Sequence, residues 1–125
     1  MQTTYEENQV ATVRKWFYDA ATVAPQAVKS QVTELSNLSG DVINLLYQYL
    51  DNFRSPIKRS EVDIYRKQMD TALEPLLTRM KQVCKEIKAI DNTPYLESQE
   101  IFKNVVDGLV KVKERDAKSR LPQNT

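Results

Sequence analysis

Apolar residues recur along most of the chain at spacings of three and four, which is the period of an amphipathic α-helix. The first such segment runs from about Thr4 to Thr22. Pro25 then marks the opening of a second helix, because the first turn does not need the N–H group that proline lacks. This second segment extends to about Phe53. Gly40 lies inside it and weakens it, so the sequence predicts either a bend or a break there.

The third segment has the most regular apolar pattern in the chain and runs from Ser55 or Ser60 to about Asp91. Its steps alternate between three and four residues, which is the heptad spacing of helices that pack against one another. Pro75 interrupts the pattern. Because an internal proline removes a hydrogen bond and clashes with the preceding turn, we expect a kinked helix or two shorter helices. The apolar stripe consists of Val62, Tyr65, Met69, Leu73, Leu76, Met80, Val83, Ile87 and Ile90.

The last segment begins at Thr93–Pro94, a pair of residue types that commonly opens a helix. We expect its helicity to fade near residues 113–115. Short connections between long helices favour antiparallel neighbours. The sequence therefore predicts an all-α fold, an antiparallel bundle of about four long amphipathic helices in which the third is kinked or split at Pro75.

The length and composition limit the number of domains and the kinds of chemical site that the chain can form. With 125 residues the chain makes one domain, and we expect the bundle to occupy residues 1–116 and a flexible C-terminal tail to occupy 117–125. Two glycines are too few for Gly-rich phosphate loops. The absence of histidine excludes His-based catalytic triads and the carboxylate–histidine metal sites of helical bundles. The sequence therefore predicts a non-enzymatic protein with no cofactor.

Charge and hydropathy say little about a partner but bear on location. The 18 basic and 17 acidic residues give a formal charge of +1, so nucleic acid is not an expected partner. No apolar run approaches the roughly 18 residues of a transmembrane helix. The single cysteine, Cys84, is interpreted as a small residue at the edge of the core. It favours a cytoplasmic chain, with a secreted mature chain as the alternative, in which the Asn37 sequon would become relevant.

Two segments carry more apolar side chains than one buried stripe can use. Three consecutive rings, those of residues 16–18, must point three ways on a helix, so at least one faces outward. Between Val42 and Phe53 the apolar face spans about 200° of the helix, which is typical of a segment packed from more than one side. We expect this surplus surface to bind a protein partner or a second copy. The candidate partner-binding residues are Trp16, Tyr18, Ile43, Leu46, Tyr47 and Leu50.

Basic residues gather at the central connection and near the end of the last helix, with acidic residues interspersed. Cations at a helix C-terminus are expected from the helix dipole alone. The alternative is contact with a phosphate or an anionic lipid headgroup. The candidates for that contact are Arg54, Lys58, Arg59, Lys111, Lys113 and Arg115.

Three functions are compatible with these features. The first is a non-catalytic interaction or assembly module that binds a partner helix or a second copy. The second is an amphipathic lipid carrier, for which Arg66, Arg79 and Lys88 supply part of the basic border that lipid-binding helices carry. The third is a small apolar ligand held between the helices near the Pro75 kink, with Tyr65 as its polar anchor. The uncharged polar flanks of the first two helices and the heptad spacing of the third favour the interaction module.

Overall fold

Four α-helices account for most of the residues that the computed structural model describes, which are 5–54, 58–91 and 95–120. The helices are α1 (Tyr5–Val23), α2 (Lys29–Asp51), α3 (Arg59–Asp91) and α4 (Tyr95–Arg120), and a short 3-10 helix, η1 (Asn52–Arg54), follows α2. These ranges contain no strand. The predicted all-α bundle is therefore confirmed.

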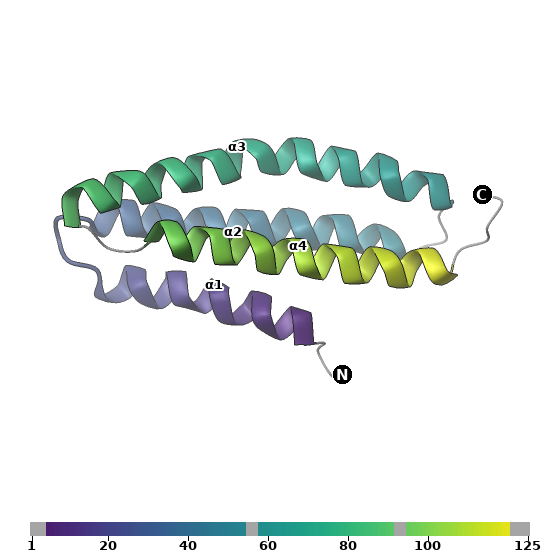
Figure 1. Ribbon diagram of the computed structural model, residues 1–125, viewed down its shortest axis with the longest axis horizontal. Helices are drawn as coiled ribbons and strands as arrows, with labels where there is room; N and C mark the ends of the chain where they lie inside the picture. The colour runs from purple at the N-terminus through teal and green to yellow at the C-terminus, as the bar shows by residue number, and fades with distance from the viewer. Residues whose placement is uncertain (1–4, 55–57, 92–94, 121–125) are drawn as a thin grey trace.

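Successive helices run in opposite directions, as Figure 1 shows. Helices α1 and α3 each pack against both α2 and α4, and α2 and α4 also touch each other. Helices α1 and α3 consequently lie on opposite sides of this central pair. The arrangement is the antiparallel four-helix bundle expected from short connections.

Each helix turns one apolar stripe inward, and these stripes form a single core. On α1 the stripe is Val10, Val13 and Phe17, all at most 3% exposed. The ring of Phe17 packs edge-to-face on that of Phe102 in α4, with centroids 5.5 Å apart. Such a ring pair contributes about 0.5–1.5 kcal/mol beyond the burial of its surface, so it helps to hold α1 on α4.

Helix α3 is continuous from Arg59 to Asp91 and contains Pro75 in its interior. The alternative of two shorter helices is therefore ruled out. Figure 1 shows α3 bowed along its length, as expected of a long helix with an internal proline. Pro75 itself is exposed, so the carbonyl freed by the missing N–H group lies on the solvent side of the bundle.

Helix α2 is likewise continuous and passes through Gly40 without a break. A Cβ atom on Gly40 would lie 3.2 Å from the Nη2 atom of Arg14 in α1. Arg14 also donates a hydrogen bond to the buried Ser36 of α2, at 3.2 Å. The glycine at this position thus makes room for a side chain that joins α1 to α2.

Helix α4 continues to Arg120, so the expectation that helicity fades near residues 113–115 is wrong. The reason lies on α3. Arg59 donates a hydrogen bond to the main-chain carbonyl of Lys118, one of the last carbonyls of α4, which no N–H group within the helix can reach. Ala117 is buried, and the Lys118 ammonium lies 3.4 Å from the Asp63 carboxylate. The boundary expected at residue 116 therefore falls inside α4.

Helix α1 is the shortest of the four, with 19 residues against 33 in α3. At 1.5 Å per residue these helices are about 28 Å and about 50 Å long. Figure 1 shows that α1 stops short of the bundle end at which α4 finishes. Among the described residues, α2, α3 and α4 extend farther toward that end than α1 does.

The core predicts that truncating a buried and an exposed apolar side chain will lower the free energy of unfolding by very different amounts. Leu35→Ala removes a side chain that is 0% exposed, and we expect it to lower the free energy of unfolding by about 2–5 kcal/mol. Ile64→Ala, at a position 55% exposed, should change it by less than about 0.5 kcal/mol. Urea denaturation followed by circular dichroism measures both. Equal losses would contradict this core.

Candidate interaction surface

Helix α1 buries one apolar stripe and leaves aromatic side chains exposed on both flanks of that stripe. Phe17 is 1% exposed, whereas its neighbours Trp16 and Tyr18 are 49% and 61% exposed. The two exposed rings lie on opposite flanks of the helix, Trp16 beside α4 and Tyr18 beside α2. Two of the three rings therefore lie outside the core, in agreement with the prediction that at least one faces outward.

A shallow hollow of about 310 Å³ lies along the seam between α1 and α4. Large apolar side chains border it, including Tyr5 at 70% exposure and Ile101 at 44%. None of its lining side chains carries a charge at neutral pH. We call this surface the α1–α4 face, and it comprises Tyr5, Gln9, Thr12, Trp16, Ile101 and Val105.

A second hollow, of about 440 Å³, lies between α1 and α2. It brings together Tyr18, Ile43 and Tyr47, three of the predicted partner-binding residues. Unlike the α1–α4 face, it is also lined by charged side chains, those of Arg14 and Lys15. Burial, reinforced by the charge of a nearby glutamate, raises the pKa of Tyr47, which keeps its hydroxyl neutral.

The remaining predicted partner-binding residues are distributed differently. Leu46 is 0% exposed and packs in the core, so its side chain is not on any outer surface. Leu50 is half-buried against the core. Trp16 lies on the opposite flank of α1 from Tyr18 and Tyr47, so the structure does not bring the predicted set together on one surface.

Sequence reasoning did not select Tyr5, Ile101 or Val105 for the interaction surface. A signal was nevertheless present, because α4 contains apolar neighbours in pairs, such as Ile101–Phe102 and Val105–Val106. One member of each pair is buried, and the other lies toward the hollow. Adjacent apolar residues cannot share one stripe, so such pairs indicate a second apolar side.

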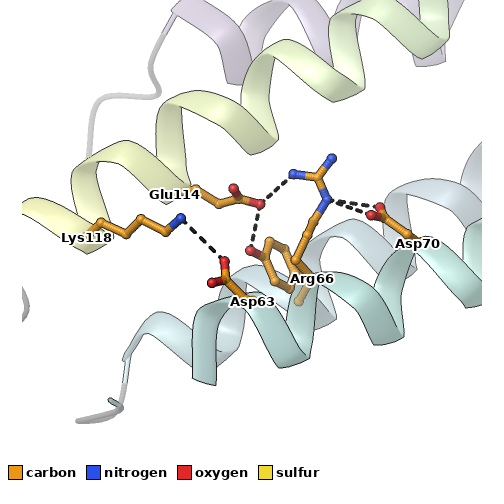
Figure 2. Close-up of polar contacts among 6 residues, drawn as sticks. Asp63, Arg66, Asp70, Glu114 and Lys118 are labelled. Carbon is orange, nitrogen blue, oxygen red and sulfur yellow. Dashed lines mark hydrogen bonds and ion pairs between the residues drawn. The ribbon is translucent and has the colours of Figure 1, made fainter. Parts of the chain in front are cut away.

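A polar network joins α2, α3 and α4 near the C-terminal part of α4, and Figure 2 draws it. Arg66 of α3 donates through Nη1 to the Glu114 carboxylate of α4 at 2.6 Å, and through Nε to Asp70 at 2.9 and 3.1 Å. The Tyr49 hydroxyl of α2 donates to the same Glu114 oxygen at 2.8 Å. A single carboxylate thus joins α2, α3 and α4.

The network keeps its members in the protonation states that the contacts require. Burial and the adjacent Glu114 carboxylate raise the pKa of Tyr49, so its hydroxyl remains a donor. Burial opposes the charge on Arg66, but the hydrogen bonds to Glu114 and Asp70 outweigh it and raise the pKa of the guanidinium. The Arg66–Glu114 contact is therefore an ion pair.

The candidates for anion contact do not form one cationic patch. Lys113 lies 2.7 Å from the carboxylate of Glu7 in α1, and this partly buried pair ties α1 to α4. Arg115 lies 3.6 Å from Asp116, and Arg59 contacts the end of α4. Lys58 and Lys111 are exposed, and the side chain of Arg54 lies outside the described part of the chain.

Two of the three basic residues considered for a lipid-binding border form ion pairs. Arg79 contacts Glu34 of α2 at 2.6 Å and Glu86 of α3 at 3.3 Å. The hydrogen bond from Arg79 lowers the pKa of Glu34. Arg66 belongs to the network of Figure 2, while Lys88 is exposed.

The site considered for a small apolar ligand is also different from expectation. Met69 and Met80 are core residues, at 6% and 0% exposure. The hollow beside Pro75 opens on the outer side of α3, where Glu74, Thr78, Arg79 and Gln82 line it. Its lining includes two charged side chains, and neither methionine is part of it.

Cys84 lies fully inside the core, at 0% exposure. Burial raises the pKa of its thiol to about 12. A neutral thiol in this position is a poor nucleophile and acts as a small packing residue.

Comparisons with known proteins give this surface no precedent. The chain matches no protein-family model, no curated protein and no solved structure. Within the described ranges, no three His, Cys, Asp or Glu side chains are grouped to hold a metal ion. None of the described helices is long and apolar enough to cross a membrane.

We predict that Glu114→Gln lowers the free energy of unfolding by about 1–3 kcal/mol, because it removes the charge of the more buried of the two carboxylates that pair with the Arg66 guanidinium. Glu74→Gln, at an exposed position on α3, should change it by less than about 0.5 kcal/mol. A double-mutant cycle that combines Glu114→Gln with Tyr49→Phe should give a coupling energy clearly different from zero. Additive effects would mean that the network does not act as a unit.

The thiol gives a second prediction. At pH 8 a group with a pKa of about 12 is ionised in only about one molecule in ten thousand, so Cys84 of the folded protein should scarcely react with Ellman's reagent. An unfolded thiol ionises from about pH 8.5, so stability should fall as the pH rises from there toward 12. Thiol titration along a urea series, and unfolding at several pH values, measure both effects. Rapid reaction of the folded chain would contradict the buried position.

Proposed function

We propose that this chain is a non-catalytic helical-bundle interaction module that docks a helix-bearing protein partner, or a second copy, on the α1–α4 face. The observation that carries the proposal is the hollow between α1 and α4, which exposes Tyr5, Trp16 and Ile101 without an intervening charge. A groove between two helices is the usual receptor for an amphipathic helix.

The residue types of the face support a protein partner. Tryptophan and tyrosine are enriched among the residues that dominate binding energy at protein interfaces. Gln9 and Thr12 supply uncharged hydrogen-bonding groups beside them. Charged residues are depleted at the centres of protein interfaces, and this face has none.

The alternative of lipid carriage has less support. Helices that lie on lipid usually border their apolar side with lysine and arginine. Here Arg66 and Arg79 lie on α3, across the bundle from α1, and both form ion pairs. The non-catalytic part of the proposal is supported by the absence of histidine and by the buried, neutral Cys84.

Native mass spectrometry of the chain isolated from its own source tests the proposal. We expect a complex that contains a second protein mass, whether another copy or a different chain. Trp16→Glu should remove that mass, because it places a charge in the centre of the face. Ile64→Glu makes the same charge change at a similarly exposed position on α3 and should retain it.

Two outcomes would overturn the proposal. One is a bare monomer, and the other is a complex that survives Trp16→Glu but is lost with Ile64→Glu. If the spectrum shows bound lipid masses and no second protein, the result supports lipid carriage in place of the interaction module.

A further inference from the structure

Resting on the proposed function, we infer that the occupant of the α1–α4 face is the same face of a second copy of this chain. We further infer that Gly108 of α4 is the point where the helices of the two copies approach most closely. The inference starts from a glycine that the single chain does not explain.

Glycine in a helix interior lowers stability relative to alanine, so its presence there calls for a reason. At Gly40 the reason is internal, because a Cβ atom would crowd Arg14 at 3.2 Å. At Gly108 a Cβ atom would meet nothing within 4 Å among the described residues. The packing of one copy therefore does not require a glycine at position 108.

The position of Gly108 connects it to the α1–α4 face. It follows Ile101 by seven residues and Val105 by three, and it precedes Val112 by four. Residues at these spacings share one side of a helix. Gly108 thus continues the side of α4 that faces the hollow, and its missing side chain lets another backbone approach closely.

The absence of charge argues for a second copy as the occupant. A two-fold interface places the same patch on both sides, so a charged residue near its centre lies close to the same residue of the other copy and is repelled by it. None of the six residues of the face carries a charge at neutral pH. The amide of Gln9 both donates and accepts, so it can pair with the same amide of the partner copy. A net charge of +1 gives little repulsion between whole chains.

The size of the face also fits a dimer. Helix α1 is about 28 Å long, and two adjacent helices are about 20 Å wide, so the side of the bundle that has the α1–α4 face at its centre covers roughly 550 Å² on each copy. The pair would bury on the order of 1,100 Å², just above the ~1,000 Å² at which specific interfaces begin. We therefore expect a dimer that dissociates in the micromolar range.

Analytical ultracentrifugation of the purified chain alone tests the inference. We expect dimers that dissociate on dilution. Gly108→Gln should weaken the dimer at least about 100-fold, since the new side chain occupies the point of closest approach, whereas Ala72→Gln, at an exposed position on α3, should leave it unchanged. Gly108→Ala should weaken the dimer about tenfold and yet raise the Tm of the dilute monomer by about 2–4 °C.

The result separates this inference from the proposed function. A dimer unaffected by Gly108→Gln, or a chain that stays monomeric up to about 1 mM, overturns the inference. A third outcome is a purified chain that is monomeric alone, together with a complex from its source that contains a different protein, which Trp16→Glu removes. In that case the inference of a second copy is wrong, and the proposed function stands. If both preparations are bare monomers, both fail.

Discussion

The packing of α1 over the central pair α2 and α4 is the constraint on which the rest of this molecule depends. Helix α1 has one apolar stripe, and Val10, Val13 and Phe17 use all of it to seal the core. Because α3 lies on the other side of the bundle, no further helix of the described chain covers the flanks of α1. The rings of Trp16 and Tyr18 remain exposed for that reason, one beside α4 and one beside α2.

The C-terminal part of α4 packs on α2 and α3 through polar groups. The contacts among these three helices there include charged side chains, which Figure 2 draws. Glu114 accepts hydrogen bonds from Arg66 and Tyr49, and Lys118 lies beside Asp63. Lys113 and Lys118 of α4 thus pair with acidic residues of α1 and α3, and these polar contacts are separate from the apolar hollow between α1 and α4.

Much of the fold could be predicted from the sequence, because the stripe of α3 and the prolines at the joints are local signals. The end of α4 could not, since it depends on Arg59, Ala117 and a contact with another helix. The site was only partly predictable. Exposed rings on α1 follow from three consecutive aromatic residues, but the pairing of Trp16 with Ile101 follows from how α1 and α4 are aligned. That alignment is set by the contacts of Phe17 with Phe102 and of Glu7 with Lys113.

The two glycines show most clearly what the structure adds to the sequence. In the sequence both interrupt a helix and both lower its stability. In the structure Gly40 accommodates Arg14, so its cost is offset within the chain, whereas nothing in the described chain offsets the cost at Gly108. Sequences tend to depart from the most stable residue where function requires it. Gly108 lies in a helix interior on the same side of α4 as the uncharged hollow, and the packing of the core does not require a glycine there. It is therefore evidence that this surface of the bundle, and not the core, determines the residue at position 108.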